Sequence, residues 1–497
     1  MAEWTLNEED LKHYRHFDAD ISAEEAVALA TSPQKVAQHA FYPFIHFEQF
    51  WNKFAKKGKK GKQKTRKIRF SARRDSYIFS YYRHLISEKY ESELEKLGLS
   101  NSVLAYRRIP SADGKAGKCN INFAKDAFQT IRRMKNCSVA VLDISDFFGS
   151  LDHQRLKEIW CQVLGFDRLP DDHFAVFKAI TNYAYVEKQD LYERLGYFGD
   201  KWRTKDEKVI SGYTVHFRDI PRQLCNGKEF REKIANPKGK KSIIKKNREC
   251  FGIPQGAPIS DVLANLYLMD FDVEISELVN ALGGVYFRYS DDILVIVPGG
   301  KGEGLDVLTK VRDRIKKYGE KLFIKEEKSS LFVFKQQIDR QDFTQFTHMG
   351  NECEFQKNGL EYLGFRYDGH QVYLRDSTLA NYWRKVTKAS RREAIRIATR
   401  YPDKSTCELK NLFNYESFIK QYSKVEGWQD KSADKKSWTF WTYAKRASYE
   451  FGELGKPIIR QLRRHDKKIR YKIDEEIGKA VCRRIERKSW GRLERII

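Results

Sequence analysis

Apolar residues along this chain form short blocks whose spacing predicts where strands and helices lie. Residues 285–287 and 293–297 are β-branched, aromatic or aliphatic, so they predict the two strands of a hairpin with a polar turn between them. Residues 138–142 are equally apolar and predict a buried strand that runs into Asp143. Helical spacing of apolar residues predicts helices over residues 23–30, 78–97 and 261–271.

The last part of the chain, after about residue 375, mixes basic residues with aromatic residues at helical spacing. This pattern predicts a mainly helical lobe in which most aromatic side chains lie in the core and a minority stack on bases. Residues 460–495 predict one long amphipathic helix that packs on the body of the protein or on another subunit. Its apolar positions are Ile469, Ile473, Ile477, Val481 and Ile485.

Two polar segments interrupt these patterns. Residues 53–74 are rich in lysine and poor in apolar residues, which predicts either a loop that contacts phosphates or a solvated linker. Residues 187–248 form a charged insert whose lysines between 238 and 246 either follow a nucleic-acid backbone or belong to a polar flap. A chain of 497 residues is too long for one ordinary core, so two or three lobes are expected.

The formal net charge of +25 at pH 7 makes the chain strongly basic, as expected of a protein that handles a polyanion. Basic proteins also bind anionic membranes, but no apolar run approaches the roughly 20 residues that cross a bilayer. The N-terminus lacks the pattern of a signal peptide, so a soluble, cytoplasmic protein is expected. The eight cysteines and 11 histidines show no metal-binding spacing, which argues against a zinc site or a disulfide framework.

The most informative polar feature is the pair Asp291 and Asp292, which interrupts the apolar hairpin. Two ionised carboxylates side by side repel one another, and burial makes this worse unless a cation neutralises them. Mg²⁺ suits this role because it binds few carboxylates and completes its shell with phosphate oxygens. The alternative is a solvated hairpin tip. A third carboxylate, Asp143, ends another apolar strand, and three acids on adjacent strands would make a two-metal site for phosphoryl transfer.

A turn rich in glycine and proline lies between these two blocks, at residues 252–260. It predicts a rigid turn that presents Gln255 to a strand or a nucleotide, followed by a helix that Ser260 caps. The same residues also fit an ordinary structural turn. Near the first acidic block, we interpret Asp146 as a structural residue and His153 as a local hydrogen-bonding residue.

Together these blocks resemble the reverse transcriptase family in order and in spacing. Residues 143–148 match the Asp-x-x-x-x-Phe/Tyr segment of that family, residues 254–256 its Pro-Gln-Gly segment and residues 289–292 its Tyr-x-Asp-Asp box. The resemblance covers roughly residues 100–370. Further matches are a lysine-bearing segment at 319–328, a Leu-Gly-Phe segment at 362–365 and a fingers segment at 106–131.

The resemblance implies an α+β, right-hand polymerase fold, with fingers and a palm that carries an antiparallel sheet. It implies a helical, basic N-terminal extension at residues 1–100, fingers and palm at 101–370 and a basic, helical, thumb-like domain at 371–497. The implied activity is that of an RNA-directed DNA polymerase, which makes DNA from dNTPs by nucleotidyl transfer with two Mg²⁺ ions as cofactors.

The resemblance also implies roles for individual residues. Asp143 and Asp291 would bind both metal ions beside Asp292, and Ile144 belongs to the implied metal set. Lys328 would donate a proton to the leaving pyrophosphate. The residues implied to contact substrate are Phe148 as the gate against a 2′-hydroxyl, Gln255 and Tyr289 near template or nucleotide, and Arg107 and Lys118 near the triphosphate, for which solvated surface is the alternative.

Among the branches of the family, the chain looks most like the bacterial abortive-infection and defence-associated reverse transcriptases. This likeness rests on a stripped layout with an N-terminal extension and a basic, helical C-terminal lobe, in which no endonuclease module or RNase H is recognisable. Retron-type enzymes usually carry alanine in the acidic box and a Val-Thr-Gly element, whereas this chain has serine there and no such element. This similarity implies an antiviral role in which a partner noncoding RNA is the template, and homo-oligomers also occur in that group. The alternatives are a retron-like or group II intron-like reverse transcriptase, an RNA-dependent RNA polymerase, and an RNA-binding protein without turnover.

Overall fold

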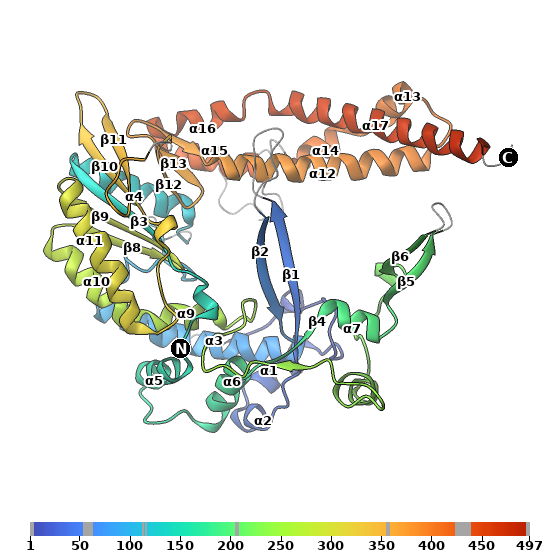
Figure 1. The fold of residues 1–497 in the computed structure, drawn as a ribbon, viewed down its shortest axis with the longest axis horizontal. Helices are drawn as coiled ribbons and strands as arrows, with labels where there is room; N and C mark the ends of the chain where they lie inside the picture. Colours follow the sequence, from blue (N-terminus) through green and yellow to red (C-terminus); the bar gives the residue numbers. More distant parts are fainter. Residues whose placement is uncertain are drawn as a thin grey trace. The chain divides into compact units, whose positions relative to one another are not determined.

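The computed structural model describes residues 4–52, 63–111, 114, 117–203, 208–353, 358–422 and 439–493. The chain forms two compact units, each assembled from separate stretches (Figure 1). Unit 1 contains Met1–Arg107, Ser138–Leu331 and Thr347–Asn351, and unit 2 contains Arg108–Cys137, Phe332–Phe346 and Glu352–Ile497. Helices, mainly antiparallel sheets and a C-terminal helical lobe confirm the predicted α+β class.

Unit 1 consists of two sheets, a separate hairpin and the helices that cover them. One sheet has the strand order β2-β1-β4-β7, and in the other β3, β9 and β8 are successive neighbours. Its elements are α1 (Ala23–Ala30), α2 (Pro33–Ala37), β1 (Phe44–Asn52), β2 (Gln63–Phe70), α3 (Arg73–Lys96), β3 (Cys137–Asp143), α5 (His153–Leu164), α6 (Asp171–Thr181), β4 (Ala184–Glu187), α7 (Lys188–Arg194), β5 (Phe198–Arg203), β6 (Lys208–Tyr213), α8 (Gly227–Glu229), β7 (Lys245–Lys246), α9 (Ser260–Tyr267), α10 (Met269–Ala281), β8 (Val285–Tyr289), β9 (Asp292–Pro298) and α11 (Lys301–Arg314).

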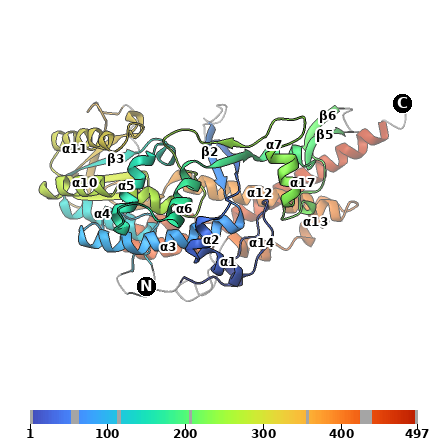
Figure 2. The ribbon, with the colours of Figure 1, turned by 90° about the horizontal axis from the view of Figure 1, so that it is seen from below.

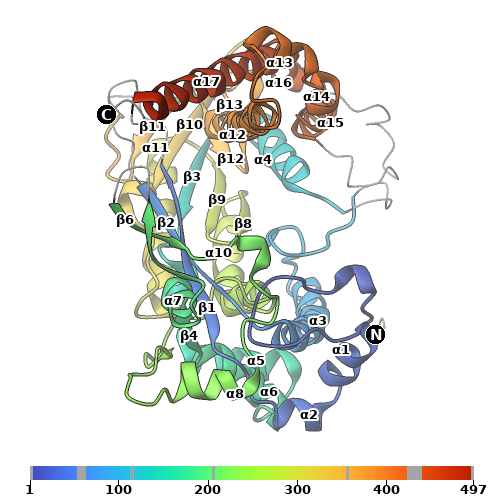
Figure 3. The same cartoon turned by 90° about the vertical axis from the view of Figure 1, so that its right-hand side faces the viewer.

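The strands β3, β8 and β9 lie where the apolar blocks predicted them. The interior of β9 is completely buried between its two end residues, as a continuous apolar run requires. Helix α10 packs on β8 (Figure 3). The single helix predicted over residues 261–271 is wrong in detail, because the chain forms α9 and α10 with a break at Leu268.

The N-terminal part of unit 1 consists of helices α1 to α3 and the β1–β2 hairpin. Helix α1 packs on α2 and α3, and α2 packs on α6 (Figure 2). The loop predicted over residues 53–74 is wrong for residues 63–70, which pair with β1 over the whole of β2, while residues 53–62 lie outside the described part. Cross-strand pairing satisfies the backbone of this basic segment, a long-range effect that its local composition does not reveal.

The charged insert at residues 187–248 is more than a polar flap. It contains the β5–β6 hairpin, and β7 pairs with β4 through Lys245 and Lys246. It also contributes apolar side chains to a buried cluster with the N-terminal part of the chain. That cluster contains Phe17, Ile45, Val186, Leu191, Tyr192, Ile220, Leu224, Cys225 and Ile234.

His16 makes the stability of unit 1 sensitive to acid. Its ring is fully buried, and the Phe17 N–H donates a hydrogen bond of 2.9 Å to its Nδ1. Burial lowers the pKa of His16 to about 4. Between pH 6.5 and about 4 the unfolded chain therefore binds a proton that the folded chain does not. Stability is complete above pH 6.5 and falls as the pH drops through this window, by up to about 3 kcal/mol.

The melting temperature of the full chain, measured across this window, tests the effect of His16. His16→Gln should make the melting temperature less dependent on pH, because the buried titrating group is gone. His13→Gln is the matched control, since His13 is exposed and should leave the dependence as it is in the unchanged protein. Equal pH dependence in both variants would contradict this assignment.

Unit 2 contains a small three-stranded sheet and the C-terminal helices. The Leu-Gly-Phe segment forms the tight turn between β12 and β13, in which Leu363 and Gly364 both have positive φ, 45° and 92°. Its elements are α4 (Asn120–Met134), β10 (Ser330–Gln336), β11 (Gln341–Thr347), β12 (Leu360–Tyr362), β13 (Phe365–Tyr367), β14 (Val372–Leu374), α12 (Asp376–Arg400), α13 (Thr406–Leu412), α14 (Tyr415–Tyr422), α15 (Phe440–Phe451), α16 (Lys456–Gln461) and α17 (His465–Leu493).

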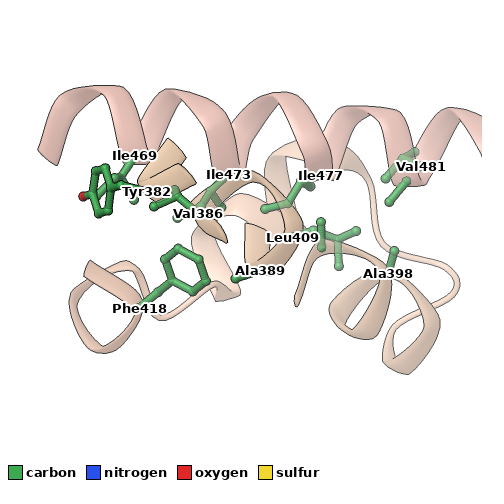
Figure 4. Packing of buried hydrophobic residues seen from close by; sticks show 12 residues of the cluster. Tyr382, Val386, Ala389, Ala398, Leu409, Phe418, Ile469, Ile473, Ile477 and Val481 are labelled. Atoms are coloured by element: carbon green, nitrogen blue, oxygen red, sulfur yellow. The ribbon is translucent and has the colours of Figure 1, made fainter. Parts of the chain in front are cut away.

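The long helices α12 and α17 lie side by side and share one apolar core (Figures 1 and 4). The predicted apolar row along α17 is buried against α12 for Ile469, Ile473, Ile477 and Val481, whereas Ile485 is exposed and does not belong to it. The helix begins at His465, not at residue 460, because the chain turns through Arg464 at a φ of 61°. Most described aromatic side chains of this lobe are buried or packed against the core, as predicted.

Candidate active site

The turn of the β8–β9 hairpin lies beside the end of β3. Tyr289 pairs with Asp292 across the hairpin, which leaves Ser290 and Asp291 as its two-residue turn. Ser290 has a φ of 59°, the positive value that the first residue of such a turn adopts. The N–H of Ile144, the residue after β3, donates a hydrogen bond of 2.9 Å to the carbonyl of Asp291. This bond ties the hairpin turn to β3, so the two acidic blocks come together.

The carboxylates of Asp143 and Asp291 interact with one another and with one lysine. Burial raises the pKa of Asp291, the negative charge of Asp143 raises it further, and Lys328 lowers it. Nζ of Lys328 donates a hydrogen bond to Oδ1 of Asp143 and forms an ion pair with it. Asp292 is exposed. The structure thus brings Asp143, Asp291 and Lys328 into one electrostatically coupled group.

This group fits a divalent cation through two carboxylates. Among the described residues, no group of three or more His, Cys, Asp or Glu side chains is placed to hold a metal ion, and Asp143 and Asp291 are the two carboxylates whose charges interact here. The donor set is nevertheless of the right kind, because hard cations take carboxylate oxygens and complete their shell with substrate phosphates. A cation bound here would lower the pKa of Asp291, against the rise that burial and the charge of Asp143 cause.

Beneath the hairpin turn lies a buried polar network that the sequence did not predict. The guanidinium of Arg288, in β8, donates to the carboxylate of Asp272, in α10, from Nε at 2.7 Å and from Nη2 at 2.5 Å. Its Nη1 donates to Oδ1 of Asn265 at 3.0 Å and to the carbonyl of Ser290 at 3.2 Å. The hydroxyl of Tyr286 donates to Asp272 at 2.6 Å. Arg288 therefore holds the backbone of the first turn residue.

The charges of this network are removed from water, since the side chains of Arg288 and Asp272 are both 0% exposed. Burial opposes the charge on Arg288, but the carboxylate of Asp272 outweighs it and raises the pKa of Arg288 above its ordinary value. A buried pair fixes one geometry, because the loss of either partner leaves an unpaired charge. Arg288 and Asp272 are thus positioning residues for the turn. A charged residue within an apolar strand is the sequence signal that identifies Arg288.

The Pro-Gln-Gly turn is attached to the turn that carries Phe148. The N–H of Ile253 donates a hydrogen bond of 2.8 Å to the carbonyl of Phe148. The carbonyl of Gln255 accepts one of 2.9 Å from the N–H of Arg69 in β2, while the Gln255 side chain makes no hydrogen bond within the described residues. At Gly256, with a φ of 126°, a Cβ atom would lie 2.5 Å from the carbonyl oxygen of Arg69, so only glycine fits.

Three smaller predictions about these turns can be compared with the structure. The N-cap of α9 is Ile259, so the prediction that Ser260 caps it is wrong, and the Ser260 hydroxyl instead donates 2.8 Å to the Pro254 carbonyl. Asp146 has a φ of 43° and its carbonyl accepts the N–H of Gly149 at 2.8 Å, which confirms a structural role. Nε2 of His153 lies 2.8 Å from the carbonyl of Gly252, which confirms a local hydrogen bond.

The two basic residues assigned to the triphosphate are engaged elsewhere. In unit 1, Arg107 forms a two-point hydrogen-bonded ion pair with Glu91, at 2.8 and 2.6 Å, and its side chain is 5% exposed. In unit 2, Nζ of Lys118 pairs with Asp126 at 2.9 Å. We therefore leave both out of the proposed site.

Tyr106 and the strand β2 contribute to the site without having been predicted to. The hydroxyl of Tyr106 lies 3.2 Å from Oγ of Ser290 in the hairpin turn. Burial raises the pKa of Tyr106, Asp291 raises it further and Arg66 lowers it, so Arg66 and Asp291 both act on this tyrosine. Because local composition predicts a loop over residues 63–70, the contribution of Arg66 was not predicted.

One family of known proteins matches part of the chain. Residues 221–367 match the family described as "Reverse transcriptase (RNA-dependent DNA polymerase)". This stretch is a reverse transcriptase domain. It contains the Pro-Gln-Gly turn, the hairpin with Asp291, and Lys328, while Asp143 lies before it. The match confirms the predicted enzyme class, a nucleotidyltransferase of the RNA-directed DNA polymerase type. None of the curated proteins matches the sequence.

Solved telomerase structures align with this chain at low similarity. Apo telomerase from Candida Tropicalis truncated from its C-terminal domain has 13% identity and a TM-score of 0.33, over 71% of this chain and 60% of that one. Apo telomerase from Candida Tropicalis has 12% identity and a TM-score of 0.36, over 93% and 68%. Telomerase from Candida albicans in complex with a telomeric RNA fragment has 10% identity and a TM-score of 0.34, over 93% of this chain and 64% of that one. The chain thus spans about 60% of the length of the first.

Proposed function

We propose that this protein is an RNA-directed DNA polymerase that joins dNTPs at a site formed by Asp143 and Asp291. The observation that carries the proposal is the hydrogen bond from Ile144 to the carbonyl of Asp291, which brings the two acidic blocks together within unit 1. The reverse transcriptase domain at residues 221–367 supplies the second block and the Pro-Gln-Gly turn.

Asp143 and Asp291 would hold two Mg²⁺ ions, with Asp292 as an accessory ligand and the backbone carbonyl of Ile144 as a further one. Bound ions would stabilise charge on the phosphoryl oxygens and activate the attacking hydroxyl. Lys328 sits beside Asp143, where its Nζ can transfer a proton to the leaving pyrophosphate. Tyr106 interacts with both Asp291 and Arg66, a basic residue of β2. Arg66 is therefore our candidate for the triphosphate contact in place of Arg107. Tyr289 flanks the hairpin turn that carries Asp291, and Gln255 lies in the Pro-Gln-Gly turn.

Primer extension tests this proposal. The protein is offered an RNA template, a DNA or RNA primer, dNTPs and Mg²⁺, and the product is digested with DNase and RNase to establish that it is DNA. A DNA product that depends on the RNA template supports the proposal. A product made only from ribonucleotides would favour an RNA-dependent RNA polymerase. RNA binding without any product under these conditions would favour the inert RNA-binding alternative.

Phe148 is expected to select deoxynucleotides. Its ring is half-buried beside Phe147, with 5.8 Å between ring centroids, on the turn that holds the Pro-Gln-Gly segment. Phe148→Ala should raise the efficiency of ribonucleotide incorporation relative to dNTPs by about 10- to 200-fold, because the bulk that meets a 2′-hydroxyl is gone. Phe148→Tyr keeps that bulk and should preserve discrimination. Unchanged selectivity in Phe148→Ala, measured by single-nucleotide incorporation, would remove the gate from the proposal.

We further propose that the template is an associated noncoding RNA and that the polymerase serves antiphage defence. The net charge of +25 supports a nucleic-acid partner, and the layout of an N-terminal extension and a basic, helical C-terminal lobe, similar to that of defence-associated enzymes, supports the role. Sequencing the RNA and DNA that co-purify with the protein, with and without phage infection, identifies template and product together. Recovery of random cellular RNA alone, in both conditions, would contradict this second proposal but not the first.

A further inference from the structure

Unit 2 contains a groove that the proposed polymerase site does not use. It lies between α12 and the chain around α13 and α14, and its volume is about 450 Å³. One side is a row of arginines on α12, and the other carries apolar and aromatic side chains. The residues that matter to the argument are Arg392, Arg396, Arg400, Tyr401 and Phe413, which we call the α12 groove.

The arginines of the α12 groove form a regular row of cations. They are spaced by four residues, so they succeed one another along the helix at intervals of about 6 Å. Arg392 and Arg396 are 74% and 76% exposed, and both pair with Glu393, at 3.5 and 2.6 Å. Each guanidinium carries five N–H donors, so one carboxylate leaves most of them available to other acceptors. The groove therefore combines three cations with one anion.

The aromatic side of the groove packs against the core of the helical lobe. Phe413 is half-buried and its ring makes edge contacts with Tyr415 and Phe418, at centroid distances of 5.0 and 5.8 Å. Phe418 is buried in the core that α12 shares with α17 (Figure 4). Tyr401 lies at the end of α12, with the guanidinium carbon of Arg400 5.5 Å from its ring centroid. The aromatic rings of the groove thus contact neighbouring side chains of the same lobe.

A row of cations beside aromatic faces matches the requirements of single-stranded nucleic acid. Arginines spaced along a helix bind successive phosphates, and an aromatic ring stacks on an unpaired base whatever its identity. A duplex would offer only its phosphates, because its bases are already stacked. We propose that the α12 groove binds a single-stranded segment of RNA through residues that do not belong to the polymerase site, with the arginines on phosphates and Phe413 on a base. The arginine row and the aromatic side chains indicate single-stranded nucleic acid, and only the statement that this nucleic acid is RNA rests on the proposed function.

Binding of a labelled, unstructured RNA of about 10 nucleotides to the full chain tests this inference. The triple variant Arg392→Gln, Arg396→Gln and Arg400→Gln should reduce the slope of log affinity against log salt concentration by about 2, because each phosphate contact contributes about 0.7. The control Arg384→Gln, Arg391→Gln and Lys467→Gln removes the same charge from exposed positions outside the groove. Equal effects of the two triple variants, or equally strong competition by duplex RNA, would overturn the inference.

A second variant tests the stacking surface without changing charge. Phe413→Leu keeps an apolar side chain in place and should weaken RNA binding about tenfold, whereas Phe413→Tyr keeps the ring and should restore it. Melting temperatures show that the variants are folded. If Phe413→Leu and Phe413→Tyr bind RNA equally well, stacking is refuted.

Primer extension on a short template separates this inference from the proposed function. The arginine triple variant should retain extension while it loses RNA affinity, because no residue of the groove belongs to the site of Asp143 and Asp291. If the protein makes no DNA but still binds RNA through the α12 groove, the proposed polymerase function is refuted and the inference about the groove stands. Loss of extension in the triple variant, equal to its loss of RNA affinity, would refute a site separate from catalysis.

Discussion

Asp291→Asn is expected to lower the rate of nucleotide incorporation by about a thousandfold or more, which corresponds to about 4 kcal/mol in the activation barrier. The substitution keeps the size of the side chain but removes one of the two carboxylate charges that would hold divalent cations at this site. Because the burial of Asp291 opposes its ionised form, the neutral amide should not destabilise the fold. Single-turnover primer extension at saturating dNTP measures this loss.

The control for this variant is Asp306→Asn. Asp306 lies on α11, is 54% exposed and pairs with Lys310, so its loss should leave incorporation unchanged. Asp143→Asn should match the effect of Asp291→Asn, and the double variant should lose little more, because groups that act as one unit are not additive. A rate within tenfold of the unchanged protein in Asp291→Asn would refute the assignment of this carboxylate.

Arg288→Met is expected to destabilise unit 1 by about 3–5 kcal/mol, because it leaves the carboxylate of Asp272 buried without its partner. Asp272→Leu should have a similar cost for the same reason. Incorporation should fall in both variants, since the carbonyl of Ser290 loses the donor that holds the turn next to Asp291. Chemical denaturation of the full chain, together with primer extension, measures both effects.

The double variant Arg288→Met and Asp272→Leu distinguishes positioning from stability. Replacing both charges by apolar side chains should recover most of the stability, because no unpaired charge remains in the core. Incorporation should stay low, since no donor reaches the carbonyl of Ser290. If the double variant regains both stability and incorporation, Arg288 has only a structural role.

Local sequence was sufficient for much of the fold. The apolar blocks at residues 138–142, 285–287 and 293–297 are strands because they can bury every side chain in a sheet. The apolar row of α17 is correct from Ile469 to Val481 because helical spacing places it on one face. The strand β2 was missed because its lysines and arginines resemble a loop until β1 pairs with them.

The sequence by itself determined the chemistry of this protein: which acids interrupt apolar strands, which glycines shape the turns, and that the chain is strongly basic. Tertiary structure alone decided which of these groups meet. It joined Asp291 to the end of β3, gave Arg288 a buried partner in α10, and turned Arg107 away into an ion pair with Glu91. The physical reason is that charge is tolerated or costly according to its partner and its distance from water, and both depend on residues far away in the chain.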